Sequence, residues 1–249
     1  MKYLSGILLA LLIPDLTLAQ PFKMMGTAEP MSNDCIRLTP DLQYMEGLAY
    51  HTTKLDLNNF FEIDFDIFLG EKDEGADGIT FVIHNDPRGF DAYGTWGECM
   101  GYGRWSKFYV GGNFIAPSIA VEFDTYFNDR QNDPLCDHVA YLENGTNFHT
   151  EYWNDDNDNF NLEDNYLHSF RFRWEPDQQQ ITVFLDGLTV YKGKRNLVQD
   201  IFDGETEVLW GFTASTGRKH NLQYFCLKKW AYNDDRQPNI SGQMAATGE

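Results

Sequence analysis

IAVEFDTYFNDRQNDPLCDH, residues 119–138, is the stretch around which the chain is organised. It begins as an apolar strand and ends as a loop rich in carboxylates and amides. Glu122 and Asp124 are two residues apart, so on a strand both carboxylates point from the same face. Two acids beside an apolar run would be costly to bury without a counter-charge, and the spacing therefore indicates a cation site.

The loop that follows supplies further ligands. Asp124, Asn128 and Asp133, with a main-chain carbonyl between them, suit Ca²⁺, which binds several oxygens at flexible angles. The same acids together with Glu122 and His138 suit a second, borderline metal, because an imidazole nitrogen has been added. Most acidic loops bind nothing, but the paired acids of the strand argue against that interpretation here.

These residues resemble the metal loop of the legume-type (L-type) lectins, which reads E-x-D-x-Y-x-N and continues with Asp and His at steps of five residues. The resemblance implies Ca²⁺ as a cofactor, with Mn²⁺ or another transition metal at the His138 site. Tyr126 would contribute its carbonyl oxygen. The implied metal ligands are Glu122, Asp124, Tyr126, Asn128, Asp133 and His138.

Composition describes a globular, acidic chain. Of 249 residues, 42% are hydrophobic and 15% aromatic, enough for a sizeable core. Lys+Arg 19 against Asp+Glu 38 gives a net charge of -19, which argues against nucleic acid or an anionic membrane as partner. No segment after the N-terminus is long and apolar enough to insert into a membrane.

The chain divides into four parts. Residues 1–19 have the features of a signal peptide: Lys2, an apolar centre and small residues before Gln20. We therefore expect a secreted protein. Residues 20–34 are expected to be an irregular lead-in, 35–232 one lectin-like domain, and 233–249 a polar, disordered tail.

Strand patterns dominate the domain. Residues 61–69 alternate between apolar and polar, which predicts a half-buried strand, and 79–83 form a short apolar run typical of a strand buried on both faces. An Asp186-Gly187 pair predicts a hairpin. Many short strands with hardly a helix predict an all-β sandwich. The resemblance makes this a concanavalin A-like jelly roll of antiparallel sheets.

Three further loops resemble sugar-contacting loops of the same family. Ala76-Asp77-Gly78 resembles the A-D-G signature, in which the Asp is the principal sugar ligand and the Ala–Asp peptide is cis. Gly97 lies in a segment that resembles the glycine loop, where a backbone N–H donates to the sugar, although Trp96, Glu98 and Cys99 interrupt the usual glycines. The segment 210–218 resembles G-F-[ST]-A-[AS]-T-G. The implied carbohydrate-binding residues are Asp77, Gly97, Tyr126, Asn128, Gly217 and Arg218.

Four cysteines, an even number in an exported chain, predict disulfides. Three connectivities are open from the sequence. Because the first and last strands are neighbours in the resembled fold, the resemblance favours Cys35–Cys226, which leaves Cys99–Cys136.

Three functions remain to be distinguished. The first is a Ca²⁺-dependent lectin that binds glycans or glycoproteins without catalysis and gains avidity as a homo-oligomer or in a larger assembly. The second is a β-glucanase-like glycoside hydrolase, whose E-x-D-x-x-E pattern fails here because Phe127 replaces the second glutamate. The third is a structural or adhesion domain that keeps metals but not sugar. Asp77 and Asn128 favour the lectin.

Overall fold

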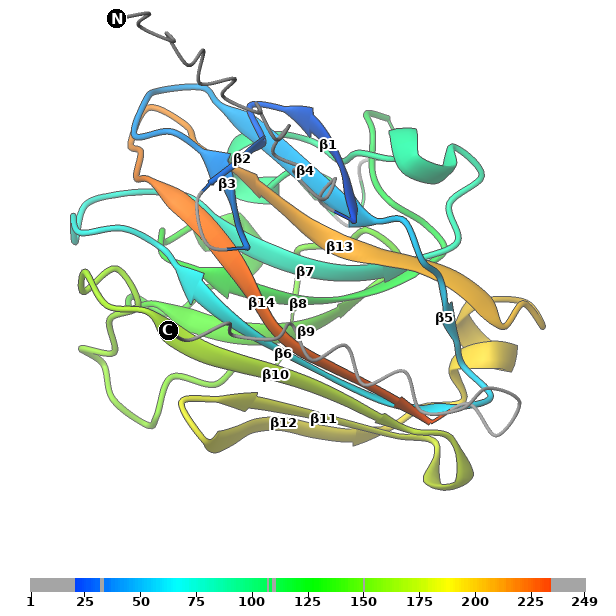
Figure 1. Ribbon diagram of the computed structural model, residues 1–249. Coiled ribbons are helices and arrows are strands. Elements are labelled where there is room, and N and C mark those ends of the chain that lie inside the picture. Colours follow the sequence, from blue (N-terminus) through cyan, green and yellow to red (C-terminus); the bar gives the residue numbers. More distant parts are fainter. Residues whose placement is uncertain (1–20, 32–33, 107, 109–110, 150, 234–249) are drawn as a thin grey trace, which may run out of the picture.

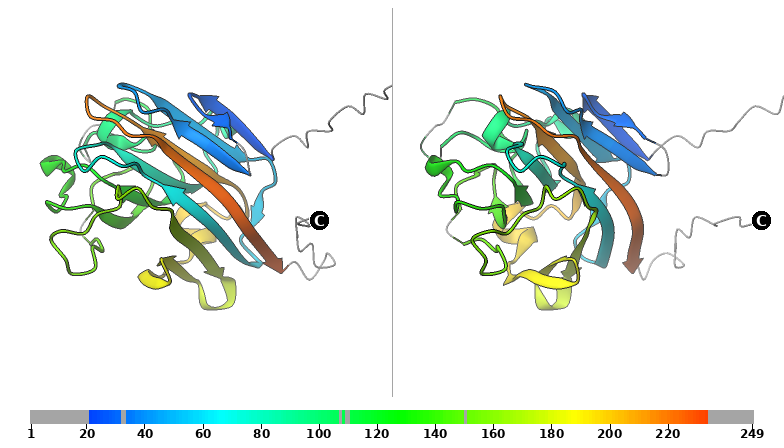
Figure 2. Two further views of the ribbon diagram at one scale, coloured as in Figure 1. Left: turned by 60° about the vertical axis from the view of Figure 1, so that its left-hand side comes forward. Right: turned by 90° about the vertical axis from the view of Figure 1, so that its left-hand side faces the viewer.

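Two antiparallel sheets packed face to face form the molecule (Figures 1 and 2). The computed structural model describes residues 21–31, 34–106, 108, 111–149 and 151–233. Each sheet has seven strands among these residues. The predicted all-β sandwich is confirmed.

The first sheet has the order β1-β4-β13-β7-β8-β9, and β5 pairs with the start of β13. It carries the paired acids on β8 and the strand that follows the A-D-G segment, β7. These two strands are hydrogen-bonded neighbours. The bounds are β1 Phe22–Gly26, β4 Glu46–His51, β5 Leu55–Asp56, β7 Gly78–His84, β8 Ser118–Asp124, β9 His138–Glu143 and β13 Glu207–Ser215.

The second sheet has the order β12-β11-β10-β6-β14-β3-β2. Figure 1 shows β14 lying beside β6, with β10 on the other side of β6. The bounds are β2 Glu29–Pro30, β3 Cys35–Thr39, β6 Phe60–Phe68, β10 His168–Glu175, β11 Gln180–Leu185, β12 Leu188–Lys194 and β14 Gln223–Asn233. Five short helical turns complete the described elements, η1 Gly89–Asp91, η2 Gly97–Cys99, η3 Asp129–Gln131, η4 Pro176–Gln178 and η5 Leu197–Ile201.

The core between the sheets is rich in aromatic side chains. Along β6 buried residues alternate with partly exposed ones, as the period-2 pattern predicts. Phe65 is fully buried and packs edge-to-face on Phe212 of the opposite sheet, with ring centroids 4.7 Å apart. Phe212 in turn stacks on Phe225 at 4.2 Å. Such pairs fix the spacing of the two sheets and thereby the positions of the strand ends that carry the loops.

Described parts of the segment 86–117, residues 86–106 and 111–117, cover the outer face of the first sheet. Tyr50, Val82 and Ala120 on that face pack with Tyr102 and Ile115 of the segment in a second buried cluster. This cover explains why β7 and β8 are buried along their whole length rather than alternately. The loop around Gly97 also meets β7, where Thr80 Oγ1 donates to Met100 Sδ at 3.7 Å.

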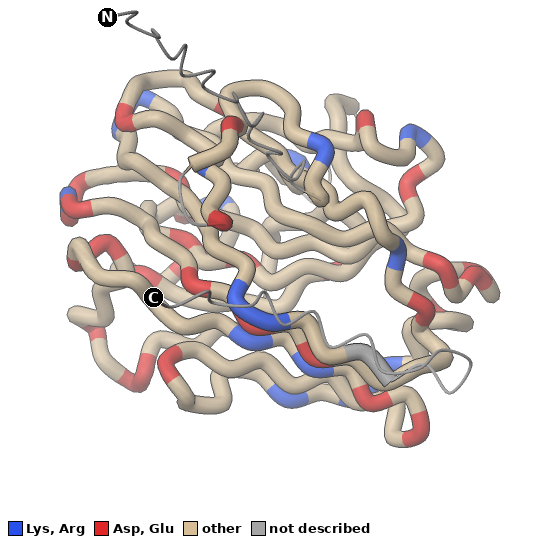
Figure 3. The backbone as a smooth tube through the Cα atoms, viewed as in Figure 1, with Lys and Arg blue, Asp and Glu red and all other residues tan. Residues whose placement is uncertain are grey.

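Opposite charges pair across the solvent-facing side of the second sheet. Lys228 Nζ on β14 lies 3.0 Å from Asp66 Oδ1 on β6, and Arg173 on β10 pairs with Glu62. The alternation of blue and red along these strands is visible in Figure 3, where red segments are also frequent in the loops. Exposed pairs of this kind contribute about 0–1 kcal/mol each, so their main effect is on solubility and register.

The predicted lead-in is wrong in part. Residues 22–26 form β1, which pairs with β4 and buries Phe22 against Trp210 and Phe225. The sequence pattern missed this strand because it is only five residues long, ends in Gly26 and lies between Pro21 and Pro30. The predicted signal peptide and nearly all of the predicted tail lie outside the described residues. Among those described, no helix is long and apolar enough to cross a membrane.

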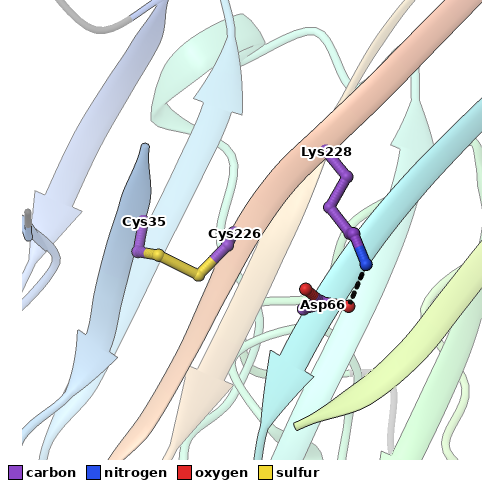
Figure 4. Close-up of a disulfide and its surroundings, with 4 residues drawn as sticks. All are labelled: Cys35, Asp66, Cys226 and Lys228. Atoms are coloured by element: carbon purple, nitrogen blue, oxygen red, sulfur yellow. Dashed lines mark hydrogen bonds and ion pairs between the residues drawn. A yellow bond between two sulfur atoms is a disulfide. The ribbon is translucent and has the colours of Figure 1, made fainter. Parts of the chain in front are cut away.

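One predicted disulfide is present and the other is not. Cys35 and Cys226 lie directly opposite each other on β3 and β14 and are bonded (Figure 4). Cys99 and Cys136 are free thiols. Cys99 is buried within η2, whereas Cys136 precedes β9 and has its Sγ 3.2 Å from Asn154 Nδ2. The Cys99–Cys136 prediction is therefore wrong, because the two thiols have separate surroundings.

Candidate functional site

Asp77 lies in the loop that leads into β7, and its backbone is held from two sides. Its N–H donates to the Ser215 carbonyl at the end of β13, and its carbonyl accepts from the Thr125 N–H, both at 3.1 Å. Thr125 directly follows β8 and begins the metal loop. The Ala76–Asp77 peptide bond is cis, as predicted. The backbone of Asp77 thus connects two of the predicted binding loops.

The Asp77 carboxylate is buried but faces two glycines. It is 5% exposed, and its Oδ2 has no hydrogen-bond partner among the described residues. A Cβ placed on Gly217 would lie 3.5 Å from this oxygen, and one on Gly97 would lie 4.0 Å away. Burial raises the pKa of Asp77 to about 7, with a further contribution from Glu98. An acceptor left bare between two glycines can receive a hydroxyl from a ligand.

The loop around Gly97 is fixed to β13. Gly97 has a φ of 64°, in the left-handed region that favours glycine. Its carbonyl accepts from Ser215 Oγ at 2.9 Å and from the Met100 N–H at 2.7 Å. Ser215 therefore holds both Asp77 and Gly97, which explains why segments from distant parts of the chain meet at one place.

Glu98 turns inward in the middle of this loop, which the sequence did not predict. Its side chain is 10% exposed and lies 3.0 Å from Arg130 Nε. It accepts hydrogen bonds from Gln131 Nε2 at 3.1 Å and from Asn128 Nδ2 at 3.4 Å. Glu98 thereby orients the amide of Asn128, a residue for which both metal and sugar contacts are predicted.

The predicted metal ligands converge at the ends of β8 and β9. Asp124 and His138 lie directly opposite each other in the register of these strands. His138 Nε2 is 3.9 Å from Glu122 Oε1 and 3.9 Å from Asp133 Oδ1. Asp133 comes from the loop after η3, where its Oδ2 accepts from the Asn128 N–H at 2.6 Å. The residues that the sequence placed in one loop therefore form one cluster.

The chemistry of this cluster fits cations. Asn128 Oδ1, Asp133 Oδ1 and His138 Nε2 are buried without a hydrogen-bond partner in the described chain. Burial and the neighbouring acids raise the pKa of Asp124 well above its usual value, and burial foremost raises that of Asp133 to about 7. Burial lowers the pKa of His138 to about 3. Carboxylates that repel each other beside a neutral imidazole are an arrangement that a bound cation would stabilise.

The family model for the legume lectin beta-barrel domain matches residues 14–229, which is most of the chain. The chain belongs to the legume lectin family. Family and structural neighbours are lectins, which bind carbohydrate and do not catalyse reactions.

Solved structures agree on the fold. The lectin of Bauhinia forficata in complex with GalNAc has a TM-score of 0.68 at 20% identity, covering 87% of this chain and 93% of that one. Lectin I-B4 of Griffonia simplicifolia, in a metal-free form, has a TM-score of 0.67 at 20% identity, covering 88% and 94%. These similarities show that the lectin domain has the concanavalin A-like sandwich.

One curated relative is bacterial. The pesticidal crystal protein Cry22Aa of Bacillus thuringiensis is 34% identical over 113 residues. The match covers 45% of this chain but only 14% of the relative's length. The likeness therefore concerns a small part of that protein.

The other predicted sugar-binding residues lie at the edge of the candidate site around Asp77. Gly217 accepts from the Tyr44 N–H at 3.1 Å, which holds the loop after β13 against residues 41–45. Arg218 is exposed, and Tyr126, within the metal loop, is 39% exposed. Phe127, at the place where a hydrolase would have its second glutamate, is 44% exposed and carries no acid. The pattern of a retaining hydrolase is incomplete at this position.

The sequence missed one residue of the metal cluster. His149 follows β9 in a separate loop, yet its Nδ1 lies 3.1 Å from Glu122 Oε1. Its Nε2 lies 4.0 Å from Asp133 Oδ1. A single histidine in a polar loop has no spacing pattern that would connect it with residues 119–138, and the lectin resemblance did not include it.

Proposed function

We propose that the domain is a Ca²⁺-dependent lectin that binds glycans through a shallow site organised by metal. The observation that carries this proposal is the bare Oδ2 of Asp77, buried between Gly97 and Gly217 and tied by its backbone to the metal loop. A purely structural domain would have no reason to keep an unsatisfied acceptor there, since such a group costs stability.

The Ca²⁺ ligands would be the carboxylates of Asp124 and Asp133, the amide oxygen of Asn128 and the carbonyl of Tyr126. Such a set of oxygens suits this ion. Bound Ca²⁺ would neutralise the buried acids and hold the metal loop in one conformation. Glu122 and His138, with shared acids, would hold Mn²⁺ or another transition metal. The bare Oδ1 of Asn128 supports this assignment.

The sugar would meet groups of complementary chemistry. Asp77 accepts two hydroxyl hydrogen bonds, and the amide of Asn128 and the N–H of Gly97 donate. The exposed ring of Tyr126 covers the apolar face of a pyranose. Gly217 and Arg218 contact the far side of the ligand. Galactose, bound in a solved structure of the lectin UEA-II, and GalNAc, bound in that of the Bauhinia forficata lectin, are the first sugars to test.

Shallow, solvent-facing sites bind single sugars weakly, so biological strength would come from several sites acting together. A homo-oligomer or a larger assembly would supply them. The predicted signal peptide supports a secreted protein that meets glycans or glycoproteins outside the cell.

The test is a glycan array probed with the purified domain in Ca²⁺ and Mn²⁺. We expect binding to one class of sugar, and Asp77→Ala to abolish it because the principal acceptor is gone. Asp91→Ala is the matched control, since Asp91 is an exposed acid paired with Lys23.

Two outcomes would count against the lectin. One is the absence of binding to every glycan by a protein whose melting temperature still rises with metal. The other is an Asp77→Ala variant that binds as tightly as the Asp91→Ala control.

A further inference from the structure

Two imidazoles, not one, face the carboxylates of the metal cluster. His138 and His149 have ring centroids 4.8 Å apart, and each side chain is only 1% exposed. Glu122, His138 and His149 can offer one ligand atom each within 4.8 Å of one another. These three residues come from β8, β9 and the loop after β9, so the fold, not local sequence, brings them together.

His149 is held with one nitrogen bare. Its Nδ1 contacts the Asn147 carbonyl at 3.2 Å and lies 3.1 Å from Glu122 Oε1. Its Nε2 is buried without a hydrogen-bond partner in the described chain, as is His138 Nε2. A backbone carbonyl on one ring nitrogen is the usual device that leaves the other nitrogen free to bind a metal.

The spacing of the bare atoms suits one ion. His138 Nε2 and His149 Nε2 lie 3.9 Å and 4.0 Å from Asp133 Oδ1, respectively. Two ligands that each lie about 2.0–2.2 Å from an ion are separated by roughly 3 to 4.4 Å, depending on the angle between them. The observed separations fall inside this range.

We propose that His149 is a ligand of the transition-metal site and that the second imidazole makes this site selective for late first-row ions such as Zn²⁺ over Mn²⁺. The inference rests on the metal part of the proposed function and is independent of sugar binding. Imidazole suits Zn²⁺, Ni²⁺ and Cu²⁺, whereas sites of carboxylate and water suit Mn²⁺, Ca²⁺ and Mg²⁺. Replacing an oxygen ligand by nitrogen therefore favours the later metals.

The competing interpretation is that His149 only neutralises Glu122. That role needs one nitrogen beside the carboxylate and places no demand on the other. It would leave His149 Nε2 buried and unpaired beside Asp133, at the cost of an unsatisfied polar atom. Coordination uses both nitrogens, one for orientation and one for the ion.

The experiment measures Kd for Zn²⁺ and Mn²⁺ by competition with a chelating dye, in the wild type, His149→Ser and His220→Gln. His220 is the matched control, a histidine paired with Asp41 away from the cluster. We expect His149→Ser to weaken Zn²⁺ binding by at least about 10- to 100-fold, because losing even a residue that only hydrogen-bonds to a metal ligand weakens binding this much. Mn²⁺ binding should weaken less. His220→Gln should match the wild type.

Equal weakening of both ions, or unchanged Zn²⁺ affinity in a folded His149→Ser variant, would overturn the proposal. A second measurement uses the wild type alone and so does not depend on the folding of a variant. In long-range ¹H–¹⁵N spectra, one equivalent of Zn²⁺ should shift the ring nitrogens of both His138 and His149. A shift of His138 alone would overturn the assignment.

Together with the glycan array, these data separate this inference from the lectin proposal. A protein that binds Zn²⁺ through both histidines but no glycan supports the inference and contradicts the lectin. A protein that binds glycans, but whose His149 ring nitrogens do not shift with Zn²⁺, supports the lectin and contradicts the inference.

Discussion

Asp77 and Gly217 face each other across the candidate sugar site. A methyl group on Gly217 would lie 3.5 Å from Asp77 Oδ2 and 3.8 Å from Oδ1, so it would fit the fold but occupy the space of a sugar hydroxyl. We predict that Gly217→Ala lowers sugar affinity about tenfold, or about 1.4 kcal/mol, as measured by calorimetry. Its Ca²⁺ affinity and melting temperature should equal those of the wild type. Unchanged sugar affinity would place the ligand elsewhere.

Glu163 is a buried acid that holds the Asp77 loop through a hydrogen bond to Gly75. It is 1% exposed and accepts from the Gly75 N–H at 3.2 Å and from Asn221 Nδ2 at 3.0 Å. Burial, with a contribution from Asp137, raises its pKa to about 8. The folded state therefore binds a proton that the unfolded state has released, and the stability that Glu163 contributes is complete below about pH 4.5 and lost as pH rises through about 8.

We predict that the difference in unfolding free energy between Glu163→Gln and the wild type, measured by denaturant titration in EDTA, changes with pH. Gln cannot titrate, so the variant should gain on the wild type by up to about 1.4 kcal/mol for each pH unit between these limits. A difference that stays constant with pH would show that Glu163 has an ordinary pKa.

Local spacing made some of these residues predictable and others not. Glu122 and Asp124 share a strand face, so their period alone indicates that they act together. His149 and Glu98 reach the same site from other loops, and no sequence spacing encodes that approach. Glu98 also stands where the family has glycine, so the resemblance could only mark it as an interruption.

Strands were predictable where one face is exposed to solvent or where several strand-favouring residues follow one another. β6 alternates and β7 contains the largely apolar run 79–83, and both were predicted. β4 was missed, because its Gly47-Leu48-Ala49-Tyr50 core is short and buried on both faces, so it has no period. β1 was missed because its burial depends on pairing with β4.

The predicted disulfide between β3 and β14 has a direct test. The Cys35–Cys226 bond spans a sequence separation of 191 residues. Replacing both residues by Ser should lower the unfolding free energy by about 2–4 kcal/mol, because the unfolded chain regains its freedom. Cys136→Ser, the matched control, should change it by less than about 0.5 kcal/mol.

Thiol counting adds an independent check on the same pairing. Alkylation of the unfolded, unreduced protein should modify two cysteines per chain, Cys99 and Cys136. If no thiol reacted, Cys99 and Cys136 would have to be bonded to each other after all. One in which Cys35 reacts would exclude the bond between β3 and β14.

The whole molecule brings together loops that begin far apart in the chain. The Asp77 loop, the loop around Gly97, the metal loop and the segment after β13 are joined by bonds to Ser215, Thr125 and Glu98. The strand pattern alone predicted an all-β sandwich, and the order of these motifs, matched to a known family, added the concanavalin A-like jelly roll and the cis peptide. Propensity and period could not have given the site, because they contain no information about which strand ends meet.

A reversible metal titration shows whether bound metal organises the sugar site. The domain would be stripped with EDTA, titrated by calorimetry with the sugar that the array identifies, and titrated again after Ca²⁺ and a transition metal are restored. We predict no measurable binding without metal, and restored binding together with a higher melting temperature when metal returns, since an ion that binds only the folded state stabilises it. Equal sugar affinity with and without metal would show that metal does not organise the sugar site.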